Sequence, residues 1–253
     1  MSSPTATPEG PVKTQLEAVL LRLRSMVIQG RFAPRSKLQE VAIAEELGVS
    51  RTPVRLALQA LAQEGLLVYS PQRGFTVRGF TVKEISDAIE VRGRLEAMAC
   101  LAVAERGLSL ATQEKLERNL DDTAVLTRVP PFTPADVTAW ARLNGEFHDL
   151  FIAEADNRML ETSIRQIDAI PLAGAGMTVT TVDNVQLIFE YVRDALTMHQ
   201  WVFDAVRQRQ GARAESLMLE HIHQGGQRLR QYLLAQSPRP ASSEWSRLRL
   251  VEG

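Results

Sequence analysis

Residues 38–61, LQEVAIAEELGVSRTPVRLALQAL, contain two helical patterns that meet at Gly48-Val49-Ser50. Gly48 suits the left-handed residue that ends a helix, and Ser50 suits an N-cap whose hydroxyl accepts from a first-turn amide. A turn this short makes the two helices cross sharply, so the stretch predicts a helix-turn-helix. Apolar residues recur at helical spacing on both sides of the turn, at Ile43, Ala44, Leu47, Val54, Leu58 and Leu61.

The second of these helices carries a polar face, made of Arg51, Thr52, Arg55 and Gln59. These positions lie opposite the apolar ones on a helix. A helix that enters the major groove needs such side chains near its N-terminus, because arginine binds guanine bidentately while hydroxyls and amides contact phosphates or bases. We therefore predict that this face contacts DNA. The alternative is an ordinary helical hairpin whose arginines are merely solvated.

The flanking sequence favours the DNA-binding interpretation. Residues 66–69 and 75–78 read as two short strands, and the loop between them carries Arg73 and Gly74, which a wing would bring to a minor groove. Arg35 is placed to touch backbone phosphate, or else is simply solvated. With the runs LGVSRTPVR, EGLL and RGFTV, residues 13–80 resemble the winged helix-turn-helix of the GntR family.

Charge is divided unevenly along the chain. Residues 13–80 hold ten Lys/Arg against five Asp/Glu, and the remainder holds 19 basic against 25 acidic residues. A basic head on an acidic body fits phosphate contact confined to the head, although imbalances of this size also arise by chance. Cys100 is the single cysteine, which excludes an intrachain disulfide and predicts a buried thiol in an intracellular protein. No run is long and apolar enough for a membrane span, and we expect a cytoplasmic location.

The fold class predicted for the whole chain is mainly α. A disordered lead (residues 1–12) precedes the winged helix-turn-helix of three helices and a β-hairpin (13–80). An all-α bundle of six or seven helices follows (83–235), and then a flexible tail (236–253). The run EVRGRLEAMAC and the later histidines resemble the FCD domain of the FadR subfamily, which implies effector binding and dimerisation there. Within the bundle we predict helices from Thr81 to Gly107 and over 110–126, 133–155, 157–170, 184–209 and 212–235.

Three of the four histidines, His148, His199 and His221, have spacings that bring them together. Asn144 and His148 are four apart and share a helix face. His199 and His221 are each 11 residues from Gln210, where two consecutive helices turn, so they are level across an antiparallel hairpin. Together these side chains could close around a metal ion, whereas His223 points elsewhere. The alternative is that they are ordinary surface or core histidines.

The same residues resemble the FCD metal site, which has an acidic residue, a histidine four later and two further histidines. Asn144 departs from that pattern, because it is a neutral and weaker ligand. Zinc suits three imidazoles; nickel, manganese and iron are the other candidates. The resemblance also implies that Arg92 meets the carboxylate of an effector. Its alternative role is a salt bridge to Glu96, one helical turn away.

These features predict a bacterial transcriptional regulator rather than an enzyme. It binds a palindromic operator in double-stranded DNA as a homodimer, and a small organic acid bound near a divalent metal modulates this binding. A first alternative is a metal-dependent enzyme fused to a DNA-binding head. Glu146 and Asp149 flank His148 as candidate bases, but neither belongs to a catalytic motif such as H-E-x-x-H. A second alternative is a regulator whose helical domain holds no metal.

Overall fold

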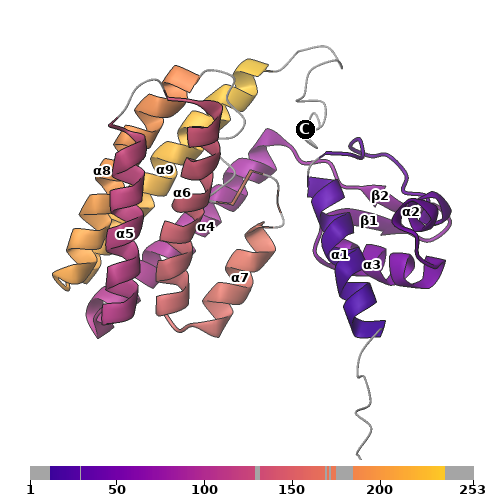
Figure 1. Cartoon of the computed structure of the whole chain (residues 1–253), viewed down its shortest axis with the longest axis horizontal. Helices are drawn as coiled ribbons and strands as arrows, with labels where there is room; N and C mark the ends of the chain where they lie inside the picture. The colour runs from indigo at the N-terminus through magenta and orange to yellow at the C-terminus, as the bar shows by residue number, and fades with distance from the viewer. Residues whose placement is uncertain are drawn as a thin grey trace, which may run out of the picture. The chain divides into compact units, whose positions relative to one another are not determined.

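The computed structural model describes residues 12–28, 30–128, 132–168, 170, 172–174 and 185–236. Backbone contacts divide these residues into two compact units, one ending at Phe80 and the other beginning at Thr81. Unit 1 combines three helices with a two-stranded sheet, and unit 2 is built from helices over its described residues (Figure 1). The predicted fold class, a winged helix-turn-helix followed by an all-α bundle, is confirmed.

Unit 1 consists of α1 (Val12–Ile28), α2 (Glu40–Leu47) and α3 (Arg51–Gln63), followed by β1 (Leu67–Ser70) and β2 (Gly74–Val77). The strands pair antiparallel with Leu67 opposite Val77 and Ser70 opposite Gly74, within one residue of the predicted bounds. Their core side packs under the helices and includes Phe75 and Val77, both about 1% exposed. The apolar positions of α3 at Val54, Leu58 and Leu61 are fully buried, as their spacing predicted.

The turn between α2 and α3 is made as predicted at its first residue and differently at its last. Gly48 has a φ of 66°, the left-handed conformation that ends α2. Ser50 occupies the N-cap of α3, but its hydroxyl makes no capping hydrogen bond, so that expectation was wrong. The physical reason is Pro53. Pro53 occupies the third helical position and lacks the backbone N–H that would donate to a serine cap there.

Helix α3 is followed by a glycine that stops it. Gly65 has a φ of 76°, its N–H donates to Ala62 O, and the N–H of Leu66 donates to Leu61 O. These two bonds form a Schellman motif, which satisfies carbonyls at the helix end and turns the chain directly into β1. Two backbone hydrogen bonds therefore fix the corner between α3 and β1.

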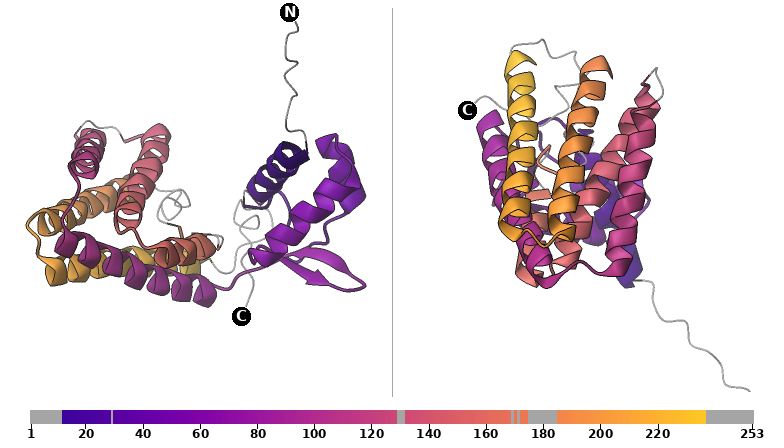
Figure 2. Two further views of the ribbon diagram at one scale, coloured as in Figure 1. Left: turned by 90° about the horizontal axis from the view of Figure 1, so that it is seen from below. Right: turned by 90° about the vertical axis from the view of Figure 1, so that its left-hand side faces the viewer.

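Unit 2 contains six helices over its described residues: α4 (Val82–Arg106), α5 (Leu110–Leu126), α6 (Pro134–Glu154), α7 (Arg158–Asp168), α8 (Val185–Arg207) and α9 (Gly211–Gln236). Thr81 and Glu84 form a capping box at the start of α4, and Thr133 and Asp136 form a second one at the start of α6. Helices α8 and α9 lie side by side and antiparallel across a short turn (Figure 2). This hairpin is what places His199 level with His221.

Helices α4 and α9 make the most extensive helix pair of unit 2, and glycines let them approach closely. A Cβ added at Gly93 would lie 3.1 Å from Cγ2 of Ile222, and one added at Gly226 would lie 2.9 Å from Cγ2 of Ile89. Cys100 of α4 is buried in the hydrophobic core of unit 2, and burial raises the pKa of its thiol well above the usual value. The thiol is therefore protonated and inert.

Parts of the predicted boundaries fall outside the described residues. Of the predicted lead and tail, only Val12 and Gln236 are described, and both belong to helices. Between the predicted helices over 157–170 and 184–209, residues 172–174 are described, and Ala173 is buried. Within the part of the chain that the structure describes, no helix combines the length and the apolar character that crossing a membrane requires.

Candidate metal centre and DNA-binding face

The predicted DNA-binding side chains of α3 share one exposed face. Arg51, Thr52, Arg55 and Gln59 are all exposed, while Val54 on the opposite side is fully buried. Both arginines lie in the first two turns of the helix, where their planar guanidinium groups can reach a DNA groove without the flexibility of a lysine side chain. The nearest acidic partner of Arg51 is Glu40, 3.7 Å away, and the Arg51 side chain remains 67% exposed. This face is free to meet a polyanion.

One exposed residue on that face was not singled out from the sequence. Leu56 is 46% exposed and follows Arg55 directly, so it lies between Thr52 and Gln59 on the helix surface. An apolar side chain in this position matches the thymine methyl group of a major groove. The sequence signal was present, since Leu56 interrupts an otherwise polar face, but it was passed over.

The wing carries the other predicted contacts. Arg73 is exposed in the turn between β1 and β2, where its N–H donates to Ser70 O. Gly74 follows with a φ of 77°, a conformation that favours glycine and keeps the tip of the hairpin narrow. Arg35 is also exposed, and its own N–H donates to Val77 O, which ties its loop to β2.

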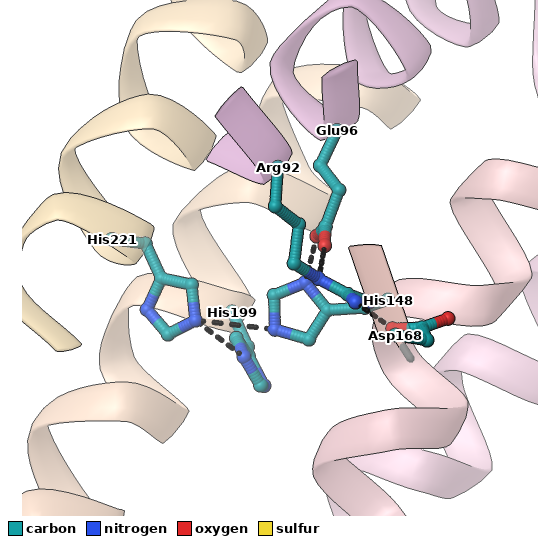
Figure 3. Close-up of polar contacts among 6 residues, drawn as sticks. All are labelled: Arg92, Glu96, His148, Asp168, His199 and His221. Atoms are coloured by element: carbon teal, nitrogen blue, oxygen red, sulfur yellow. Dashed lines mark hydrogen bonds and ion pairs between the residues drawn. The ribbon is translucent and has the colours of Figure 1, made fainter. Parts of the chain in front are cut away.

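Three histidines from three helices converge inside unit 2. His148 comes from α6, His199 from α8 and His221 from α9, and all three are buried (Figure 3). Nε2 of His221 lies 3.1 Å from Nε2 of His199 and 3.3 Å from Nε2 of His148. Two nitrogens bound to one tetrahedral zinc ion at 2.0–2.1 Å would lie about 3.3–3.4 Å apart. Both distances from Nε2 of His221 are close to this spacing, and the ligand atoms of the three histidines all lie within 4.8 Å of one another.

Glu96 of α4 fixes the orientation of His148. One carboxylate oxygen contacts Nδ1 of His148, and the other contacts Nε of Arg92 (Figure 3). Burial raises the pKa of Glu96, but His148 and Arg92 outweigh it and lower the value to about 2. An ionised carboxylate only accepts hydrogen bonds, so Nδ1 of His148 carries the proton and its Nε2 presents a lone pair to the cluster.

Aromatic stacking orients the second ring. The imidazole of His199 stacks on Phe147 with centroids 3.8 Å apart, and Trp140 lies 5.7 Å away on a nearly parallel plane. Nδ1 of His199 is buried and has no hydrogen-bond partner among the described residues. Its position is therefore set by packing instead of by a carboxylate.

The rings of His199 and His221 are neutral at physiological pH. Burial lowers the pKa of His199 well below its usual value, and the neighbouring His221 and His148 add to this effect. Burial also lowers the pKa of His221 to about 3. Neutral imidazoles whose lone pairs face one another repel, and a cation bound between them removes that repulsion. The donor set fits a divalent metal, and the three residues could hold one.

A small cavity of about 40 Å³ adjoins the histidines. Its lining includes Arg92, Asn144, His148 and His221, so Asn144 faces the same space as two of the histidines, as predicted from its spacing. Among the described residues that line the cavity, Arg92 is the only lysine or arginine. The alternative considered for Arg92, an ion pair with Glu96, is present, and Arg92 contacts Asp168 as well.

Two residues of this centre were missed or undervalued in the sequence. Glu96 was considered only as a partner of Arg92, yet it also holds His148 from 52 residues away. Asp168 was not considered, because its contact with Arg92 spans 76 residues and no local pattern signals it. His223, predicted to point elsewhere, is exposed.

Comparison with known proteins assigns both units. Residues 15–77 match the family model described as bacterial regulatory proteins, gntR family, and residues 87–224 match the FCD domain. The HTH-type transcriptional repressor RspR of Escherichia coli (strain K12) is 27% identical over 245 residues, covering 94% of this chain and 95% of the repressor. The uncharacterized HTH-type transcriptional regulator YdhC of Bacillus subtilis (strain 168) is 25% identical over 215 residues, covering 84% of this chain and 89% of YdhC.

The solved structure of E. coli McbR/YncC shares the fold, with a TM-score of 0.63 at 20% identity over 86% of this chain and 98% of that one. The relatives are regulators and the matched domains are regulatory, so the enzyme alternative is not supported. The two family models together cover most of the chain. The chain therefore belongs to the GntR family of bacterial DNA-binding transcriptional regulators, in the subfamily that carries an FCD domain.

Proposed function

We propose that the protein binds a palindromic operator as a homodimer, and that a small carboxylate metabolite bound beside a metal ion in unit 2 modulates this binding. One observation carries the proposal. The Nε2 atoms of His148, His199 and His221 converge next to a cavity that also contains the guanidinium of Arg92. A metal and an arginine facing one small space form a site suited to a carboxylate.

The DNA contacts we propose lie on α3 and the wing. Arg51, Thr52, Arg55 and Gln59 meet the major groove, while Arg73, Gly74 and Arg35 approach the flanking backbone or minor groove. A single recognition helix reads too few base pairs to select one site in a genome. Two copies of the chain on a two-fold symmetric operator supply the required specificity.

In the metal centre we assign His148, His199 and His221 as ligands, with zinc as the ion that suits three imidazoles. Asn144 lies beside them with a neutral amide, which is a weaker ligand than the carboxylate it replaces in the family pattern. When bound, the ion supplies a Lewis acid that attracts a carboxylate oxygen. Glu96 supports His148 from behind and keeps its Nε2 directed at the ligand position.

Arg92 is the residue we assign to the effector. Arg92 is 3% exposed, and Glu96 holds its guanidinium in place. Arginine presents several N–H groups in a fixed plane, so one partner does not exhaust its capacity. For an effector to change operator binding, it must bind one dimer geometry better than the other.

The experiment that tests this proposal is a thermal shift assay of the full chain against a panel of organic acids, with and without chelator. We expect about one ion per chain in protein purified without chelator, and stabilisation by an acid that chelator abolishes. An acid at one hundred times its Kd stabilises the folded state by about 2.7 kcal/mol. His221→Ala should remove the effect, whereas His223→Ala, a change of an exposed histidine two residues away, should preserve it.

Acid stabilisation that survives both chelator and His221→Ala would instead support a regulator whose unit 2 works without metal. That second candidate is favoured by Asn144 in the position of the acidic ligand. Absence of any acid effect in the presence of bound metal would contradict the effector assignment.

A further inference from the structure

The two carboxylates that contact Arg92 differ in how far they are exposed to solvent. Glu96 contacts Nε of Arg92 and is itself 1% exposed, so it belongs to the core. Asp168 contacts Nη1 of the same guanidinium (Figure 3), and the Asp168 side chain is 41% exposed. A carboxylate at the surface regains its hydration when it leaves, so Asp168 can be released at far lower cost than Glu96.

Asp168 is also the last residue of a lightly anchored helix. Helix α7 buries Leu160 and Ile164 among its described side chains, and neither lies in its last turn. Asp168 therefore joins the last turn of α7 to the core, between the apolar contacts of the first two turns and the buried Leu172 and Ala173 that follow the helix. The contact is a tether between α7 and the core of unit 2, not a part of that core.

The charges near Arg92 leave little room for a further anion. Glu96 and Asp168 both form ion pairs with this one arginine. A bound effector carboxylate would add another negative charge to this group. The balance is restored when one of the existing carboxylates leaves, and Asp168 is the exposed one.

The volume of the cavity limits the size of the ligand. The cavity next to the histidines measures about 40 Å³, whereas an apolar cavity that accepts benzene measures about 150 Å³. An organic acid larger than a few water molecules therefore needs the site to widen. No residue of α7 is among the described lining residues, so the release of Asp168 contributes the N–H group that such an acid needs rather than space.

We propose that Asp168 is an internal competitor for Arg92: an effector carboxylate takes over the guanidinium end that Asp168 holds, and the C-terminal end of α7 is released. This inference rests on the proposed function, because it assumes that Arg92 meets the effector. It adds a chemical requirement, since the ligand must carry a carboxylate or an equivalent anion. A neutral analogue cannot replace Asp168. It also assigns α7 as the element whose position reports occupancy.

The test is calorimetric binding of acetate, succinate and citrate to the full-length, metal-loaded protein, with acetamide as a neutral analogue. Asp168→Asn keeps the shape but removes the competing charge. We expect it to bind the acids about tenfold more tightly than the wild type, as it should if Asp168 holds Arg92 for roughly nine-tenths of the time. Binding of acetamide should not change.

The matched control is Glu161→Gln, which removes a carboxylate from the exposed Glu161–Arg165 pair on the same helix. It should bind the acids as the wild type does. An Asp168→Asn protein that binds no more tightly than the wild type overturns the competitor. In that case, acid binding that Arg92→Lys abolishes leaves the proposed function standing. If no acid binds either protein, the carboxylate effector itself fails, and the competitor fails with it.

Hydrogen exchange on the unmodified protein gives a second measurement that needs no variant. Saturating acid should accelerate amide exchange in residues 165–168 and leave the first turns of α7 unchanged. Unchanged or slower exchange at residues 165–168 in the acid-bound protein would overturn the release of α7.

Discussion

Glu96 joins the two chemical halves of the candidate site. Its two oxygens serve different partners, since one holds Nδ1 of His148 and the other holds Nε of Arg92. The first contact sets the tautomer of a proposed metal ligand, and the second positions a cation next to the same space. A change at this single buried side chain therefore affects metal affinity and anion binding together.

We predict that Glu96→Gln weakens metal binding by about 10- to 100-fold, the usual effect of losing a carboxylate behind a histidine ligand. The measurement is zinc affinity by competition with a chromophoric chelator. Glu146→Gln is the matched control, because Glu146 lies on α6 in an exposed pair with Arg142. Equal zinc affinity in wild type and Glu96→Gln would show that His148 does not depend on this carboxylate.

The sequence indicated those residues of this site that are related by their spacing along one helix or a helical hairpin. The step of four between Asn144 and His148, and the equal distances of His199 and His221 from Gln210, indicated a shared position. The contacts of His148 with Glu96 and of Arg92 with Asp168 depend on how separate helices pack, which no spacing along the chain determines. The sequence therefore predicted that these side chains lie together, but not the contacts that support them.

At the scale of elements, the packing of α4 against α9 positions the site. Helix α4 carries Arg92 and Glu96, and α9 carries His221, so the distance between these helices sets the width of the cavity. Gly93 and Gly226 allow the close approach, with Ile222 and Ile89 filling the space that a side chain would need.

We predict that Gly226→Ala destabilises the protein, although alanine is the better helix former by about 1 kcal/mol. The new Cβ would lie 2.9 Å from Cγ2 of Ile89, a branched and buried side chain with little freedom to move. Overpacking of this kind costs about 1–3 kcal/mol, so the net loss should be roughly 1 kcal/mol. Urea unfolding measures it, with the neighbouring exposed change Gln227→Ala as control. A gain in stability for Gly226→Ala would mean that the helices part easily.

The recognition helix could be predicted almost completely, because its signals are local: a glycine turn, an apolar stripe and a polar face. Its one error concerned Ser50, where Pro53 removes the expected donor. Cap chemistry depends on which N–H groups exist, and this could have been inferred from the sequence. The strand bounds of the wing were displaced by one residue, since pairing register is set by the partner strand.

We predict that Arg51→Ala lowers specific operator affinity by about 1–3 kcal/mol and reduces the discrimination between bases at the position it contacts. The operator is first obtained by selection from random duplexes, and affinity is then measured by fluorescence anisotropy at fixed salt. Arg142→Ala removes an equal charge from an exposed position on α6 and should leave affinity unchanged. Unaltered affinity for Arg51→Ala would remove α3 as the reader of bases.

At the scale of the whole molecule, we propose that recognition and sensing are divided between the two units. Unit 1 presents arginines on an exposed helix face, and unit 2 encloses the histidine cluster and the cation that suits an acid. The two units regulate transcription together only if effector binding in unit 2 changes the affinity of unit 1 for DNA. Coupling of this kind is a free energy, typically about 1–3 kcal/mol, and it acts in both directions.

The central claim is therefore tested most directly by operator affinity of the metal-loaded full chain, measured with and without a saturating acid that thermal shift has identified. We predict that the acid changes the operator Kd by about 5- to 150-fold, and that the change is lost in Arg92→Lys while His223→Ala retains it. An operator Kd that stays the same when the acid is bound would contradict the account.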